Sequence, residues 1–277
     1  MESIVRRTSA RRSSPSRKVN LSLLIILLAC GAPIAQAQTA RAAAVYYDRA
    51  NAHYGKGNMK AAVADYTAAI AFDPEFAEAY SRRAQARTAL GDLEGALSDL
   101  KKAIEIDPEF VEARGNLGNL RLAMGDYEAA LGDLNKALEL DHGYADAYIN
   151  RGLIKRQRGD FDGALDDFNK AIAANPRLAM AYNNRGSIYL ARGDLKAAVA
   201  EFNRSLEIDP RLAIAYANRA MANLADGNDA GAESDARRCL ELNKRLKATL
   251  EQCFSQIREQ RMAKNGGKDA GAGTAKP

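Results

Sequence analysis

Four asparagines stand 34 residues apart in the chain: Asn116, Asn150, Asn184 and Asn218. The same register holds Asp48 and Arg82 further upstream. An amide side chain offers both a hydrogen-bond donor and an acceptor, so a row of asparagines can hold the backbone of an extended peptide whatever its side chains. The alternative is that asparagine is simply a common residue at this register, and the sequence leaves both interpretations open.

A second periodic set combines an arginine with an acidic residue 16 positions later. The pairs are Arg49 with Asp65, Arg83 with Asp99, Arg151 with Asp167, Arg185 with Glu201, and Arg219 with Asp235. In one further register Leu117 replaces the arginine, which leaves Asp133 without that partner. The spacing puts one charge on each of two packed helices, so we predict an internal ladder of ion pairs. An exposed pair is worth only about 0–1 kcal/mol. The alternative is a basic groove for an anionic ligand.

No group of residues has the spacing of a catalytic or metal centre. The two histidines, His53 and His142, have no cysteine or carboxylate cluster around them at metal-ligand spacing. The glycine-rich stretch NGGKDAGAG lacks the preceding strand and following helix of a phosphate-binding loop, and no nucleophile motif is present. The sequence therefore predicts a protein that is not an enzyme and that holds no metal or cofactor.

The periodic residues belong to a unit that recurs six times. Copies of 34 residues begin at Ala42, Phe76, Phe110, Tyr144, Leu178 and Leu212, and the last ends at Arg245. Each copy contains two helical patterns separated by a glycine: Gly57, Gly91, Gly125, Gly159, Gly193 or Gly227. Glycine suits the left-handed turn that ends a helix, and the Asp or Asn that follows it suits the cap of the next helix. Proline closes four copies, and His142 and Lys244 replace it in the other two.

The 34-residue spacing, with its aromatic and small positions, resembles the tetratricopeptide repeat. Tyr46, Tyr80, Tyr148, Tyr182 and Tyr216 stand where that family favours tryptophan, and Arg114 is the outlier. The resemblance covers residues 42–245 and implies an all-α, right-handed α-solenoid of six helix-turn-helix repeats. Because stacked copies need caps at their ends, residues 246–262 are predicted to form a capping helix. Residues 263–277 have no apolar period and are predicted to form a disordered tail.

The resemblance also implies where a partner binds. In the family, the first helix of each copy lines a concave groove, and its groove positions here hold the four asparagines and an apolar set: Ile149, Leu153, Met180, Leu190, Ile214, Met221 and Leu224. The N-terminal half of the groove offers Glu78, Arg82, Glu112 and Asn119 instead. Gly115 and its equivalents include no lysine, so the family's clamp for acidic C-terminal tails is missing. The main site is therefore predicted between the third and sixth copies.

Cys239 and Cys253 are expected to meet in such a solenoid, because the family packs the helix of the first cysteine on the helix that follows. In an exported protein, two cysteines that meet are expected to form a disulfide. The alternative is two small buried apolar residues.

Residues 1–37 have the pattern of a secretory signal peptide. Basic residues precede the apolar run LSLLIILLA, and Ala35 and Ala37 fit a cleavage site before Gln38. A competing interpretation is a bacterial lipoprotein signal over residues 1–29, with Cys30 lipidated. The leader holds six of the 40 basic residues and one of the 35 acidic ones, so the mature chain has 34 of each. A neutral chain does not favour nucleic-acid binding.

These features predict an exported, periplasmic adaptor that binds a protein or peptide partner in its groove, with its oligomeric state left open. Two alternatives remain. The first is a scaffold tethered to the outer membrane through a lipidated Cys30, and the second is a non-enzymatic accessory subunit of an envelope enzyme complex.

Overall fold

The computed structural model describes the backbone of residues 21–271 and the side chains of residues 37–263. All regular structure within that part of the chain is helical. The helices are α1 (Leu21–Gly55), α2 (Met59–Phe72), α3 (Ala77–Leu90), α4 (Leu93–Ile106), α5 (Val111–Met124), α6 (Tyr127–Leu140), α7 (Ala145–Gln157), α8 (Phe161–Ala174), α9 (Ala179–Ala191), α10 (Leu195–Ile208), α11 (Ala213–Asp226), α12 (Asp229–Leu242), the short 3₁₀ helix η1 (Lys244–Leu246) and α13 (Lys247–Gly271).

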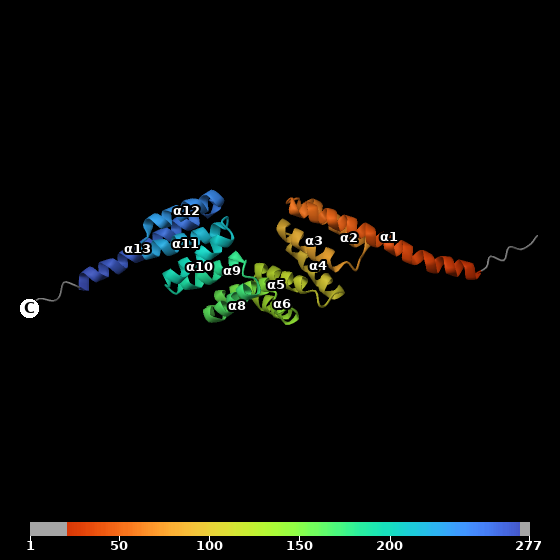
Figure 1. Ribbon diagram of the computed structural model, residues 1–277, viewed down its shortest axis with the longest axis horizontal. Coiled ribbons are helices and arrows are strands. Elements are labelled where there is room, and N and C mark those ends of the chain that lie inside the picture. The colour runs from red at the N-terminus through yellow and green to blue at the C-terminus, as the bar shows by residue number, and fades with distance from the viewer. Residues whose placement is uncertain (1–20, 272–277) are drawn as a thin grey trace, which may run out of the picture. The chain divides into compact units, whose positions relative to one another are not determined.

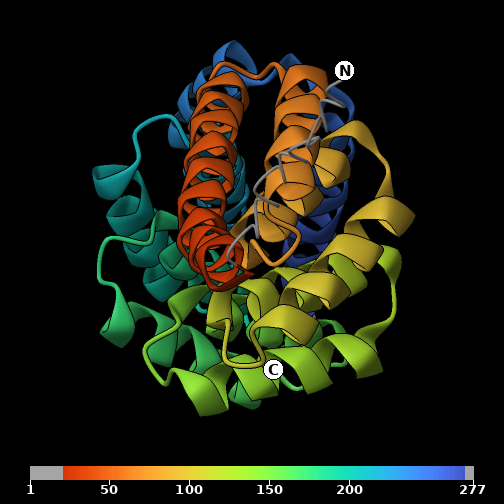
Figure 2. The same cartoon turned by 90° about the vertical axis from the view of Figure 1, so that its right-hand side faces the viewer.

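The chain divides into two compact units between Glu75 and Phe76. In the first unit, α1 and α2 pack side by side, as the red and orange helices in Figure 2 show. In the second unit, α3 to α12 form five consecutive pairs, which Figure 1 shows in chain order. The first helix of each of these pairs also packs on the first helix of the next, and α13 packs on α11. The predicted all-α repeat solenoid is confirmed.

The turn inside each copy depends on its glycine. All six turn glycines have φ between +78° and +89°, the left-handed region that disfavours any residue with a Cβ atom. In five copies the next side chain accepts a hydrogen bond from the backbone N–H three residues further on, and Asn58 in the first copy does not. The predicted capping role is therefore confirmed from the second copy to the sixth.

The end of each second helix is fixed by a short polar side chain that the sequence interpretation overlooked in favour of proline. Asp73, Asp107, Asp141, Asn175, Asp209 and Asn243 each accept a hydrogen bond from the backbone N–H two residues later. This Asx turn is present in every copy, and it supplies a stop by itself. His142 and Lys244 can therefore replace proline without loss of the turn.

The core within each copy pairs a small residue on the first helix with a large one on the second. Tyr66, Leu134, Phe168 and Phe202 are fully buried, and Leu100 nearly so. A Cβ atom added to Gly152 would lie 2.7 Å from Cε1 of Phe168, and one added to Gly186 would lie equally close to Phe202. The small residue is thus a steric requirement of its large partner in these copies.

The two ends of the described chain differ from the predicted boundaries. Helix α1 begins at Leu21, upstream of the first copy at Ala42, and its backbone stays helical through Gly31 and Pro33. Helix α13 continues beyond Met262 to Gly271, so part of the predicted tail is helical. The segment between Met262 and Gly271 contains no proline that would stop the helix. The side chain of Cys30, the predicted lipidation site, lies outside the described residues, as does most of the predicted signal peptide. Among the residues that the structure describes, none of the helices combines the length and the apolar character of a membrane span.

Candidate functional site

The asparagine column lies on α5, α7, α9 and α11, but it does not form one open surface. Asn218 Nδ2 donates to Asn183 Oδ1 at 2.8 Å, and Asn116 Nδ2 donates to Ser81 Oγ at 3.3 Å. In both cases the acceptor lies on the preceding copy, 35 residues earlier. These two asparagines join neighbouring copies to each other.

The same register leaves the other two asparagines without an acceptor. Gly115 stands 35 residues before Asn150 and has no side chain, and Ile149 stands 35 residues before Asn184 and is apolar. The Nδ2 atom of Asn184 is buried and has no hydrogen-bond partner among the residues that the structure describes.

The prediction that all four asparagines face solvent is wrong for two of them. Asn184 is 4% exposed and Asn218 is 9% exposed, whereas Asn116 and Asn150 are half-buried. The first helices of successive copies pack directly on one another, so an amide on their shared edge is covered by the neighbouring helix.

The predicted apolar lining is also only partly accessible. Leu224 is 1% exposed, and Ile149 is buried against Ala171 and Ala181, so both belong to the core and not to an open groove. Met180 and Ile214 are the accessible members, at 40% and 37% exposed. The remaining three, Leu153, Leu190 and Met221, are half-buried.

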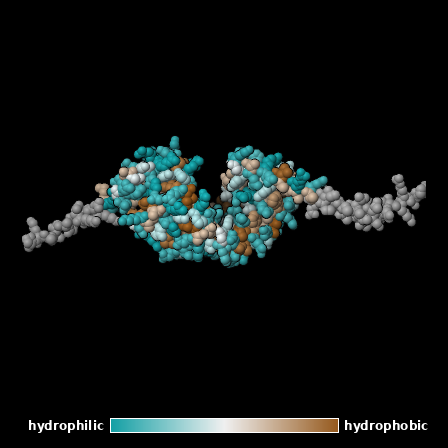
Figure 3. All heavy atoms as spheres, in the orientation of Figure 1, coloured by the Kyte–Doolittle hydropathy of each residue, from teal (hydrophilic) through white to brown (hydrophobic). Residues whose placement is uncertain are grey.

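Met180 and Ile214 extend a column whose other members are acidic. The same position of the first helix holds Glu78, Glu112 and Asp146 in the second, third and fourth copies, and all three are exposed. None of these carboxylates has an ion-pair partner among the residues that the structure describes. The column therefore changes from anionic to apolar between the fourth and fifth copies. The face seen in Figure 3 is largely hydrophilic, with apolar groups scattered over it.

The arginine ladder has the geometry that the spacing predicts. All five pairs are formed, with N–O distances of 2.6 Å in Arg49–Asp65, 2.7 Å in Arg83–Asp99, 2.6 Å in Arg151–Asp167, 2.8 Å in Arg185–Glu201 and 2.6 Å in Arg219–Asp235. Each arginine also lies over the ring of the tyrosine three residues before it, with 4.9 to 5.5 Å between the guanidinium carbon and the ring centroid. The recurring Tyr-x-x-Arg spacing was the available signal for this contact, which the sequence interpretation missed.

Three arginines of the ladder also connect neighbouring copies. Arg151 donates to Asn135, Arg185 to Asn169 and Arg219 to Asn203, and each asparagine lies on the second helix of the preceding copy. These guanidinium groups are committed to protein partners, so the ladder is structural, and the alternative of a basic groove loses its support.

Asp133 shows what happens where the ladder arginine is missing. Leu117 occupies that position, and Asp133 pairs instead with Arg121, four residues further along α5. The pKa of Asp133 is raised, because burial outweighs the effect of Arg121. The pKa of Asp65 is lowered, because Arg49 donates to it. The sequence interpretation left Asp133 unpaired because it considered only one arginine position.

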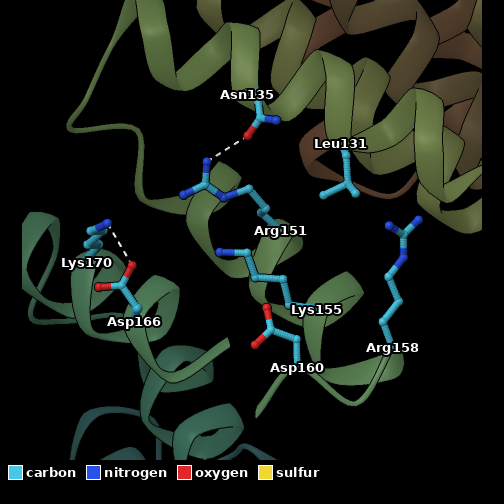
Figure 4. Close-up of a pocket in the computed structure, with 8 residues that line it drawn as sticks. All are labelled: Leu131, Asn135, Arg151, Lys155, Arg158, Asp160, Asp166 and Lys170. Atoms are coloured by element: carbon cyan, nitrogen blue, oxygen red, sulfur yellow. Dashed lines mark hydrogen bonds and ion pairs between the residues drawn. The ribbon is translucent and has the colours of Figure 1, made fainter. Parts of the chain in front are cut away.

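The cavity in Figure 4, about 510 Å³ in volume, is part of this ladder. It is lined by Leu131, Asn135, Arg151, Lys155, Arg158, Asp160, Asp166 and Lys170, from α6, α7, α8 and the turn between α7 and α8. Its four cations have carboxylate partners: Arg151 and Lys155 pair with Asp167, Arg158 with Glu128, and Lys170 with Asp166. An anionic ligand would have to displace these contacts, so we assign the cavity no binding role.

Cys239 and Cys253 are both free thiols, so the predicted disulfide is wrong. Cys239 is buried with Ala217 and Leu250, and Phe254 packs against the same cluster. Successive residues of a helix point about 100° apart, so Cys253 points in a different direction from its neighbour Phe254. Burial raises the pKa of the Cys239 thiol. Cys239 therefore acts as a small core residue. Within the described residues no cluster of His, Cys, Asp or Glu has the arrangement of a metal site.

Comparison with known families and structures agrees with this architecture. Models described as tetratricopeptide repeat match residues 149–213 and 109–177, and a model described as TPR repeat matches residues 50–91 and 84–125. No curated protein is similar enough in sequence to be matched with the chain.

Three solved structures represent the similar folds. A tetratricopeptide repeat protein from Parabacteroides merdae is 24% identical, with a TM-score of 0.64 over 77% of this chain and 84% of its own. The pilF protein of Pseudomonas aeruginosa is 16% identical, with a TM-score of 0.68 over 80% of this chain and 99% of its own. YrrB, described as a TPR protein with an unusual peptide-binding site, is 22% identical, with a TM-score of 0.50 over 70% of this chain and 97% of its own. At these identities the likeness concerns the fold.

Proposed function

Because the chain belongs to the tetratricopeptide repeat family, whose members are generally non-catalytic protein-interaction scaffolds, we propose that it is a periplasmic, non-enzymatic adaptor. Its partner is an extended peptide segment or a protein that presents one. The contact is made by the first helices of the third to sixth copies.

The single observation that carries this assignment is the pair Met180 and Ile214. Both are large apolar side chains, 40% and 37% exposed, at equivalent positions of adjacent copies. Exposed apolar groups that recur on the binding face of a repeat array are a recognised mark of an interaction surface. Burial of this surface in a complex is favourable by about 25 cal/mol per Å² of apolar area.

The variant Met180→Asp/Ile214→Asp tests the surface. A carboxylate introduced into each contact has to be desolvated on binding, so we expect a loss of about 3 kcal/mol, on the order of 100-fold in Kd. The measurement is crosslinking in the native host followed by mass spectrometry, with the captured partner then titrated against both proteins. Leu90→Asp/Met124→Asp is the matched control, since these residues are 44% and 39% exposed at the turn end of their helices. Equal partner capture by the test and control variants would exclude this surface as the binding site.

The periplasmic location is supported by the basic leader, its apolar run, and the small residues Ala35 and Ala37. We expect the mature protein isolated from the native host to begin at Gln38, as measured by intact-mass and N-terminal peptide mass spectrometry. A mature chain that begins at a lipid-modified Cys30 would instead identify a membrane-tethered scaffold. A chain that retains residue 1 would contradict both cleavage sites, and its uncleaved leader would then associate it with the membrane.

A further inference from the structure

The asparagine column is interrupted where the third and fourth copies meet. Asn116 reaches Ser81 and Asn218 reaches Asn183, but the residue in the acceptor register of Asn150 is Gly115. Asn150 therefore has no hydrogen-bond partner among the described residues. A cavity of about 230 Å³ opens beside it, lined by Gly115, Asn116, Asn119, Tyr144, Asp146, Ile149 and Asn150.

The lining of this cavity is rich in oxygen atoms that accept hydrogen bonds. Its lining residues include Asp146, three asparagines and Tyr144, each of which carries a side-chain oxygen that can accept a hydrogen bond, and no lysine or arginine is among them. Burial raises the pKa of Tyr144 to about 12, and the nearby negative charges of Asp146 and Glu112 act in the same direction. The local field therefore favours a positive charge, and the tyrosine stays neutral.

A second unsatisfied group lies at the next junction of the column, between the fourth and fifth copies. The register that pairs Asn116 with Ser81 and Asn218 with Asn183 places Ile149 opposite Asn184, and Ile149 is a wall of the cavity. The buried Nδ2 atom of Asn184 has no acceptor. The two gaps thus fall at consecutive junctions, the first between the third and fourth copies and the second between the fourth and fifth. An unmade hydrogen bond at a buried donor costs free energy, and only an acceptor, such as a backbone carbonyl of a bound segment, could compensate the gap at Asn184.

The size of the cavity and its position limit what it can hold. Ligand pockets for drug-sized molecules begin at about 300 Å³, so this cavity suits one side chain rather than a whole small molecule. The position of Asp146 on the first helix is held by the exposed carboxylates of Glu78 and Glu112 in the two preceding copies. It is held by the apolar Met180 and Ile214 in the two following copies.

We propose that this cavity binds the cationic side chain of a partner segment, preferentially an arginine, next to apolar residues that pack on Met180 and Ile214. The planar guanidinium has five N–H donors, which can serve the Asp146 carboxylate and several amide oxygens together. This inference rests on the proposed peptide-binding function and names the chemistry of its ligand. It also predicts that ligands with an acidic residue at this place are rejected, because two carboxylates would then face each other.

The test uses two fluorescein-labelled nonapeptides that differ only in their central residue, with leucines on both sides of either arginine or glutamate. Fluorescence anisotropy with the full mature chain should give a Kd for the arginine peptide that is about tenfold lower or better. Asp146→Asn should remove most of this preference, because the exposed carboxylate is lost without a change in side-chain size. The matched control is Glu78→Gln, at the equivalent position of the second copy but outside the cavity, which should alter the preference less than about twofold.

A second variant tests the cavity itself. A Cβ atom added to Gly115 would lie 2.2 Å from Cε1 of Tyr144, so Gly115→Ala forces the tyrosine ring to move and reduces the space for a side chain. If circular dichroism shows that this variant is folded, it should bind the arginine peptide at least fivefold more weakly, with the glutamate peptide little changed.

Equal binding of both peptides to the unaltered chain would overturn the cation preference and leave the groove function intact. If neither peptide binds, the cavity assignment is overturned. The capture experiment with Met180→Asp/Ile214→Asp decides the proposed function separately.

Discussion

Arg151→Leu is expected to lower the free energy of unfolding by about 3 kcal/mol, the lower end of the range for breaking a buried ion pair. Asp167 is fully buried and accepts from Arg151 Nε at 3.0 Å and from Nη2 at 2.6 Å. The substitution leaves this carboxylate with Lys155, at 2.8 Å, as its one ion-pair partner within residues 37–263. It also removes the hydrogen bond to Asn135 that connects the fourth copy to the third. The measurement is urea unfolding followed by circular dichroism.

Two further variants separate the buried charge from a general effect of substitution. Arg151→Leu/Asp167→Asn should be more stable than Arg151→Leu alone, because the uncompensated charge is then removed. Lys136→Leu should change stability by less than about 0.5 kcal/mol, since its partner Glu139 and Lys136 itself are largely exposed. An Arg151→Leu protein that keeps its full stability but loses its partner would contradict the structural role and return the arginine to the binding site.

The third copy shows why Arg151→Leu is expected to lower the free energy of unfolding only moderately. Leu117 already occupies the arginine position there, and Asp133 pairs with Arg121 instead. Burial raises the pKa of Asp133, so its ionised form is disfavoured in the folded protein. A group with a raised pKa stabilises the fold most at acidic pH, and this contribution is lost as the pH rises through the folded-state pKa. The third copy therefore tolerates its missing arginine at some cost at neutral pH.

The parts of the fold that the sequence predicts are those governed by local backbone chemistry. Gly91 and its equivalents require φ near +80°, and from the second copy on Asp92 and its equivalents accept from the following helix, so the helix boundaries at these turns follow from residue type. The arginine ladder is predictable for a similar reason, because a spacing of 16 residues joins the two helices of one copy across a short turn.

The predictions that failed depend on how closely neighbouring copies approach. Whether Asn184 faces solvent or a neighbouring helix is decided by the packing of α7 on α9, which the periodicity of one copy does not contain. Leu224 satisfies the groove register and is nevertheless covered. The disulfide is not formed because Phe254, the residue after Cys253, packs against the cluster that contains Cys239. The gap at Gly115 is visible only when residues 35 apart are compared, one more than the repeat length.

Phe168→Ala is expected to lower the free energy of unfolding by about 3–5 kcal/mol, as for other fully buried phenylalanines. Its ring occupies the space above Gly152, where an added Cβ would lie 2.7 Å from Cε1. Gly152→Ala alone should therefore destabilise the protein by roughly 1 kcal/mol, since overpacking outweighs the helix propensity that alanine gains.

The sign of the Gly152→Ala effect should reverse when Phe168 is already alanine. The ring is then absent, and the same substitution should stabilise the protein by roughly 0.5–1 kcal/mol through helix propensity. Gly132→Ala is the matched control: this glycine lies within α6 with nothing within 4 Å of an added Cβ, so its substitution should be stabilising in both backgrounds. Urea unfolding of the four proteins of the cycle, with and without Gly132→Ala, measures the coupling. If Gly152→Ala has the same effect whether residue 168 is phenylalanine or alanine, the glycine is not required by the phenylalanine, and the pairing of small and large positions does not determine the packing within a copy.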